Sequence, residues 1–175
     1  MAASYSSRSS REQFEVYRFH WLTLVLVPLC ALLLQAYLPL RFPFFALFDL
    51  PLLVTIYFSV GRRSQVSGMA TGCIIGLLQD SLTHRPLGLY GFAKTVVGYA
   101  ASSLGVRLDV DNPGTRLLLG FGFYIVHQSL YFAVARLLTI QALSWRWGHE
   151  VIGAVANGLL AVILFALLDR LRQRA

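Results

Sequence analysis

The sequence predicts an all-α membrane protein of about six transmembrane helices, and two observations support this prediction. Hydrophobic residues make up 57% of the 175 positions and charged residues only 13%, with a mean hydropathy of +0.63. Such a composition leaves too few polar residues to cover a soluble domain. Apolar runs of roughly 17 to 25 residues recur along the chain without the strict alternation of a membrane β-barrel. Because hydrocarbon offers backbone groups no hydrogen-bond partners, these runs must be helical.

A single transmembrane domain is expected over residues 20–170, between a disordered tail at residues 1–19 and a basic tail at residues 171–175. With a cytoplasmic N-terminus, ten arginines fall in inner segments and only three in outer loops. The positive-inside rule therefore predicts that both termini are cytoplasmic. The six spans are expected near residues 21–40, 44–60, 66–83, 87–105, 116–138 and 149–168.

The second span is expected to be broken. The sequence "FDLP" interrupts its apolar run, and Asp49 can cap a helix that begins at Leu50 or Pro51. Such a helix, ending near residue 60, rises only about 16 Å. Residues 43–49 must then complete the crossing as a kinked or re-entrant segment shielded by protein. Broken helices also form binding sites in transporters, so a transport function stays open at this point.

The third and fourth spans are expected to form a close antiparallel hairpin. Small or polar residues recur every three or four positions along both spans, so they share one face of each helix. Small residues at this spacing let two helix backbones approach closely within a membrane. The sequence "HRPLG" supplies a short outer turn. The pattern comprises Ser64, Gly68, Gly72, Gly76 and Asp80 in the third span and Gly91, Lys94, Gly98, Ser102 and Gly105 in the fourth.

Two charged residues within this hairpin are predicted to pair with each other. Asp80 lies six residues before Pro86 and Lys94 eight residues after it, so their depths match to within about 3 Å. A charge near the bilayer centre costs on the order of 3 kcal/mol, which pairing partly offsets. The pair is either purely structural, or it marks a polar seam that faces a partner or ligand.

A second polar layer is expected between the fifth and sixth spans. His127 and Gln128 lie near the centre of one run and Asn157 near the centre of the other. Since buried polar atoms need partners in hydrocarbon, an interhelical hydrogen bond is the first expectation. A ligand-binding or proton-relay role for His127 is the alternative.

No catalytic, cofactor-binding or metal-ligating residue is predicted. The sequence contains no phosphate-binding glycine loop, no HExxH pattern and no Cys/His cluster. Cys30 and Cys73 are expected to be packing residues. The basic residues are scattered among apolar runs, which argues against a nucleic-acid surface. Membrane binding, scaffolding or transport therefore remain as functions.

The stretch "YFSVGRRSQVSGMATGCIIGLLQDSLTHRPLGLYGFAKTVVGYAASSLG" resembles the central hairpin of the rod shape-determining protein MreD family. Gly76, Asp80, Pro86, Leu87, Gly88 and Tyr99 match its pattern of a glycine-rich helix, a short turn with P-L-G and a further helix. Asp49 and the pair Asn157–Gly158 resemble polar positions of the second and last spans. The resemblance covers about residues 20–170, and Lys94 is not part of the family pattern.

This resemblance implies a fold similar to the S-component of ECF vitamin transporters, placed in the bacterial cytoplasmic membrane. It implies a non-catalytic, cofactor-free scaffold of the cell-wall elongation machinery that binds MreC within the bilayer. MreB, RodA and a class B penicillin-binding protein are the implied wider partners. The alternative function is a vitamin-binding subunit that uses outer residues such as Asp49, Asp80, His84, Arg85 and Tyr90. A lipid or channel subunit built on His127 and Asn157 is a third possibility.

A protein with so little mass outside the bilayer must act through helix packing, short loops and charged tails. The exposed faces of the broken second span or of the glycine seams are therefore predicted to receive the single helix of MreC. Gly68, Gly72 and Gly98 are the seam residues that would form this contact.

Overall fold

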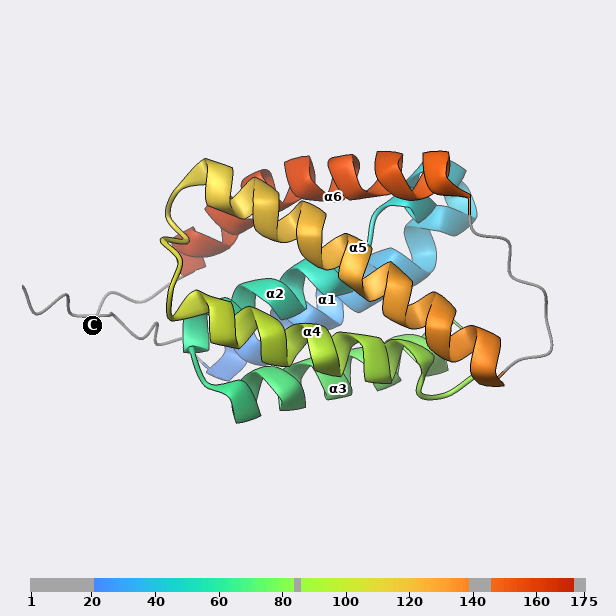
Figure 1. Cartoon of the computed structure of the whole chain (residues 1–175), viewed down its shortest axis with the longest axis horizontal. Helices are drawn as coiled ribbons and strands as arrows, with labels where there is room; N and C mark the ends of the chain where they lie inside the picture. Colours follow the sequence, from blue (N-terminus) through green and yellow to red (C-terminus); the bar gives the residue numbers. More distant parts are fainter. Residues whose placement is uncertain (1–20, 84–85, 139–145, 172–175) are drawn as a thin grey trace, which may run out of the picture.

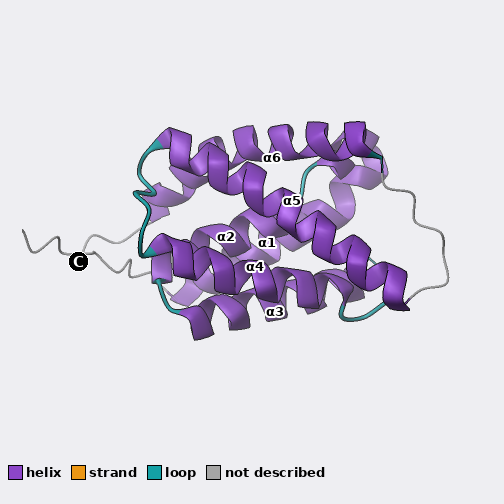
Figure 2. Cartoon of the chain, in the orientation of Figure 1, coloured by secondary structure: helices purple, strands orange, loops and turns teal. Residues whose placement is uncertain are grey.

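The computed structural model describes residues 21–83, 86–138 and 146–171, and these residues form a bundle of helices (Figure 1). No strand occurs in these three ranges (Figure 2), so the all-α prediction is confirmed. The predicted tails and the residues His84 and Arg85 of the outer turn lie outside the described residues, apart from Leu171. The helices are α1 (Trp21–Arg41), η1 (Pro43–Leu47), α2 (Leu50–Arg62), α3 (Gln65–Leu82), α4 (Leu89–Gly105), α5 (Pro113–Leu138), α6 (Trp147–Leu168) and η2 (Asp169–Leu171).

The second span is broken as predicted. The 3-10 helix η1 is followed by the two-residue junction of Phe48 and Asp49, and α2 begins directly after Asp49. The carboxylate Oδ1 of Asp49 accepts a hydrogen bond from the backbone N–H of Leu52 at 3.0 Å. Pro51 lies in the first turn, where its missing N–H costs nothing. Local capping chemistry therefore determines where this helix starts.

The short helix α2 forms the centre of the bundle. Every residue from Pro51 to Gly61 is buried, and α2 packs against each of the five other α-helices. Leu52, Ile56 and Phe58 are fully enclosed, and Phe165 of α6 contributes to the same core. Because lipid tails are as apolar as these side chains, close packing rather than the hydrophobic effect holds them together.

The helices alternate in direction, so their connections gather at two ends of the bundle. The start of α1, the α2–α3 and α4–α5 connections and the end of α6 lie at one end, on the left in Figure 1. The α3–α4 turn and the η1–α2 junction lie towards the other end. We call the first of these the terminal end of the bundle.

The hairpin of α3 and α4 confirms the predicted close contact. Gly68 and Gly72 face the backbone of Gly98 and Lys94, and Gly76 faces Tyr90 and Gly91. A Cβ atom added to any of the three α3 glycines would lie closer than 3.0 Å to a backbone atom of α4. The α3–α4 contact is the most extensive between any two described helices.

Three of the described helices are long and apolar enough to cross a membrane. They are α1, α5 and the final helix over Trp147–Leu171, which includes η2. Helix α2 is apolar but shorter, since the break at Asp49 removes part of its length. Six transmembrane helices were predicted, and the described part of the chain forms six α-helices. That all six cross the membrane remains a prediction.

Candidate functional site

A buried ionic network lies where the start of α2 meets α4 and α5. Lys94 Nζ on α4 donates to the carboxylate Oδ2 of Asp49 at 2.7 Å and lies 3.2 Å from Nε2 of His127 on α5. The same carboxylate oxygen lies 3.7 Å from His127 Nδ1. Lys94 and His127 are both fully buried. A buried ion pair of this kind is stable only when each partner stays in place.

Aromatic rings cover the network on one side. The ring of Tyr90 stacks on His127 with centroids 5.6 Å apart and on Tyr131 with centroids 4.9 Å apart. The ammonium of Lys94 lies 5.1 Å from the centroid of the Tyr90 ring, within cation–π range. The rings therefore shield the charges from lipid and add an attractive contact for Lys94.

The predicted ion pair between Asp80 and Lys94 is wrong. Lys94 is bonded to Asp49, and Asp80 is bonded to the backbone at the start of α4. Equal depth in the membrane fixes the positions of two residues in one dimension only. The break in the second span brings the carboxylate of Asp49 closer to Lys94 than that of Asp80. Asp80 and Lys94 therefore belong to two separate sites. The choice between a structural and a partner-facing role has to be made for each site on its own.

Two amide side chains complete the junction between η1 and α2. Asn157 of α6 accepts from the backbone N–H of Asp49 at 2.9 Å and donates to the carbonyl of Leu47 at 2.9 Å. Gln35 of α1 donates to the carbonyl of Phe48 at 2.9 Å and accepts from the N–H of Leu50 at 3.0 Å. A broken backbone within a membrane protein needs such partners, because lipid supplies none.

The predicted layer of His127 and Asn157 therefore has a different geometry. The structure describes no hydrogen bond between the two side chains, and both converge on Asp49 instead. The neighbouring Gln128 donates to Glu150 of α6 at 3.0 Å. The sequence analysis did not predict a role for Gln35, although a polar amide within an apolar run indicates a buried hydrogen bond.

Asp80 acts as a cap for α4 from the facing helix. Its Oδ2 accepts from the backbone N–H groups of Gly88 and Gly91, at 2.9 and 3.1 Å, and its Oδ1 accepts from Tyr90 at 3.0 Å. Gly88 has φ of +101°, a left-handed conformation that favours glycine. The carboxylate thus satisfies three of the free N–H groups at a helix start, where negative charge is also favourable.

Replacing Asp80 by asparagine is expected to lower the free energy of unfolding by about 1–3 kcal/mol. Asparagine offers one acceptor oxygen instead of two, so at least one N–H at the start of α4 would face an amide donor. Thermal unfolding of the purified protein in detergent measures the loss. The exposed Asp109 is the control, because Asp109→Asn can keep its one bond to the N–H of Asp111. Equal melting temperatures for the two variants would contradict the capping role.

A second ionic cluster, which the sequence reading missed, lies at the terminal end of the bundle. Arg116 of α5 is buried and donates to Asp169 Oδ2 at 2.6 Å and to the carbonyl of Val110 at 2.7 Å. Tyr57 of α2 donates to the other oxygen of Asp169 at 3.0 Å. The cluster fastens the end of α6 to α2 and to the start of α5.

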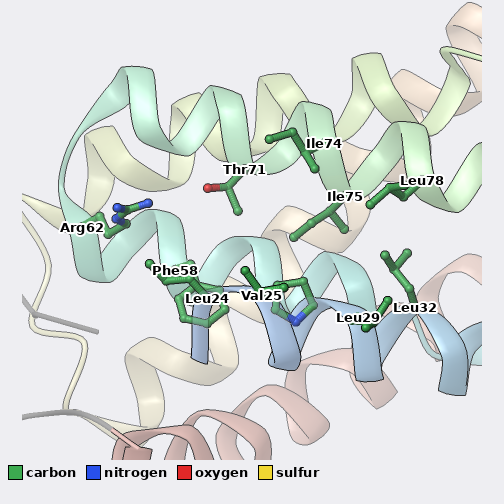
Figure 3. A pocket seen from close by; sticks show the side chains of 11 residues that line it. Leu24, Val25, Leu29, Leu32, Phe58, Arg62, Thr71, Ile74, Ile75 and Leu78 are labelled. Carbon is green, nitrogen blue, oxygen red and sulfur yellow. The ribbon is translucent and has the colours of Figure 1, made fainter. Parts of the chain in front are cut away.

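An apolar groove opens on the side of the bundle between α1 and α3, with α2 as its floor. Its volume is about 320 Å³, and Figure 3 shows side chains of α1 and α3 facing each other across it. Phe58 lies on the floor, and Arg62 lies at one end of the groove. The α1 wall is formed by Leu24, Val25, Pro28, Leu29 and Leu32, and the α3 wall by Thr71, Ile74, Ile75 and Leu78.

The glycine seams do not offer a surface to another protein. Gly68, Gly72 and Gly98 are buried in the contact between α3 and α4, and α2 is enclosed from Pro51 to Gly61. The prediction that these glycines receive a partner helix is therefore wrong. Of the second span, only Phe44, Phe45 and Ala46 of η1 are exposed.

The comparison with protein families gives a match over nearly the whole chain. The family of the rod shape-determining protein MreD matches residues 16–171. The chain belongs to the MreD family. No curated protein and no solved structure showed significant similarity to it.

Membership in the MreD family supports a role in rod-shape determination, and this family is part of the MreBCD rod-shape complex. MreD is known as a structural, shape-determining protein. The geometry agrees with such a role. Asp49, Asp80, Lys94 and Asn157 bond to groups within the chain, where they hold helices together.

Proposed function

We propose that this MreD protein is a non-catalytic scaffold that crosses the cytoplasmic membrane several times and binds the single transmembrane helix of MreC. Through MreC it would couple to MreB, RodA and a class B penicillin-binding protein. Both termini would be cytoplasmic, and residues 20–170 would form one transmembrane domain between two short tails. The arginine distribution supports this orientation, since the described inner segments gather at the terminal end of the bundle.

The lateral groove between α1 and α3 is the observation that supports MreC binding. Exposed apolar side chains are the ordinary lipid-facing surface of a membrane protein, so exposure alone identifies no partner. A concave apolar surface is different, because it lets a second helix gain more van der Waals contact than lipid chains provide. From Leu24 to Leu32 the groove extends about 12 Å, or about two turns of a docked helix.

The buried polar groups favour the scaffold over a vitamin-binding subunit. Asp49 and Asp80 were the carboxylates that such a subunit would use in the outer half of the bundle. Asp49 bonds to Lys94 and to Leu52, and Asp80 accepts three backbone N–H groups. A ligand would have to displace these bonds, whereas a helix in the groove displaces only lipid.

Filling the groove is expected to reduce MreC recovery at least tenfold. Val25 and Ile74 are 57% and 60% exposed on the two walls, so tryptophan at either position fits in the monomer but occupies the groove. The measurement is co-purification of untagged MreC with tagged V25W or I74W protein from membranes in mild detergent. Loss of rod shape in cells that depend on the variant is the second readout.

The matched controls lie on α6, outside the groove. Val155 and Ile163 are 48% and 68% exposed there. The variants V155W and I163W carry the same residue changes and are expected to retain MreC within twofold. Full recovery of MreC with V25W and I74W would show that the groove is not the docking site. Equal losses for all four variants would show the same.

A further inference from the structure

A second hollow, separate from the groove, lies at the terminal end of the bundle where three chain segments meet. Its volume is about 510 Å³. Arg63 comes from the end of α2 and Arg107 from the connection that follows α4. Gln65, Ser102, Ser103, Leu104 and Val106 complete its lining, and we call it the Arg63–Arg107 pocket.

The lining of this pocket is cationic. Of the seven described residues that line it, two are arginines and none is acidic. The hydroxyls of Ser102 and Ser103 donate to carbonyls within α4, so the guanidinium groups are the charged donors of the pocket. Guanidinium groups bind phosphate oxygens in a bidentate manner, which makes a phosphate group the ligand of matching chemistry.

The backbone at Arg63 also indicates that an arginine is useful there. Arg63 ends α2 in the left-handed conformation with φ of 52°, the one positive φ among the described non-glycine residues. Glycine is the usual residue at such a helix end, because a side chain makes this conformation unfavourable. The chain accepts this strain at a half-buried residue that lines the pocket.

An apolar surface continues from the pocket along the hairpin. Met69 lies one turn beyond Gln65 on α3 and is 42% exposed, and Tyr99 lies one turn before Ser103 on α4 and is 46% exposed. Gln65 and Ser103 are hydrogen-bonded to each other at 3.0 Å, so these two faces adjoin. A ligand that fills both regions has a phosphate at one end and a hydrocarbon chain at the other.

We propose that the Arg63–Arg107 pocket binds the phosphate of an anionic phospholipid, with an acyl chain lying along Met69 and Tyr99. The pocket lies at the end of the membrane helices, which is the level of lipid headgroups. Basic pockets between transmembrane helices bind such headgroups in other membrane proteins. This site uses none of the side chains that line the groove between α1 and α3.

Native mass spectrometry of the delipidated, full-length protein in detergent tests the site. Phosphatidylglycerol is expected to bind at least fivefold more tightly than phosphatidylcholine, and its affinity should fall as salt is raised. In the variant R63Q/R107Q the affinity for phosphatidylglycerol should fall at least fivefold. The control R62Q/R170Q removes the same charge from exposed arginines at the same end of the bundle and should stay within twofold.

Two further measurements separate lipid binding from misfolding and from binding of a free anion. R63G should fold at least as well as the parent protein, because glycine suits the left-handed backbone, yet it should also lose phosphatidylglycerol affinity. Inorganic phosphate at the same concentration should not compete. Equal binding of the two lipids, or unchanged affinity in R63Q/R107Q and R63G, would overturn the proposal. Competition by inorganic phosphate would reassign the pocket to a free anion and overturn the lipid assignment.

Discussion

Replacing Lys94 by methionine is expected to lower the free energy of unfolding by about 3–5 kcal/mol. Methionine has a similar length but no charge, so the carboxylate of Asp49 would be left buried without its ammonium partner. His127, which lies 3.2 Å from the ammonium, would lose a contact as well. Unfolding of the purified protein in mixed micelles with increasing denaturing detergent measures the difference.

A double-mutant cycle identifies the partner of Lys94. Asp49→Asn removes the charge but keeps an oxygen that can cap α2, so the single change isolates the ion pair. The variant D49N/K94M should be more stable than the sum of the single losses predicts, with a coupling of about 2 kcal/mol. The same cycle with Asp80→Asn should give a coupling below about 0.5 kcal/mol. A larger coupling with Asp80 would contradict the arrangement in the structure.

The helices were predictable because their signals are local. Apolar runs of sufficient length, the cap at Asp49 and the proline that follows it all lie within a few residues of the boundary that they determine. The start of α2 and the break before it were therefore placed correctly. The four-residue spacing of glycines likewise predicted the close contact between α3 and α4.

The partners of the buried charges were not predictable from the same signals. Depth along a hairpin places Asp80 near Lys94 in one dimension, but pairing also depends on which face each helix presents. The free N–H groups at the start of α4 compete with Lys94 for the carboxylate of Asp80. The sequence does indicate this competition, because Asp80 lies eight residues before Gly88 and so across the turn from these N–H groups. The position of Asp49 beside Lys94 depends on the path of η1, and no short sequence pattern predicts that path.

The glycine pattern also did not determine which helix packs against the glycine face of α3. Small residues indicate a close helix contact but do not say whether the second helix belongs to the same chain. The structure answers this within the hairpin, where α4 fills the seam of α3. The partner of Arg116 could not be predicted from a local pattern either, because Asp169 lies 53 residues away at the end of α6.

Replacing Gly72 by alanine is accordingly expected to destabilise the protein itself, by about 3 kcal/mol, rather than to remove a partner. The added methyl group would meet the carbonyl of Lys94, a backbone atom that moves only if α4 shifts. Such a shift would also disturb the bond between Lys94 and Asp49. The measurement is the amount of folded monomer recovered from membranes, together with its melting temperature.

Gly122 in α5 provides the matched control, because a methyl group there would meet no atom within 4 Å. Gly122→Ala should raise stability by up to about 1 kcal/mol, since alanine loses less backbone entropy than glycine on forming a helix. Opposite signs for the same chemical change would show that contact between helix backbones, and not helix propensity, determines the effect at Gly72. A Gly72→Ala protein that is fully folded but fails to retain MreC would instead place the partner against α3 and contradict the internal seam.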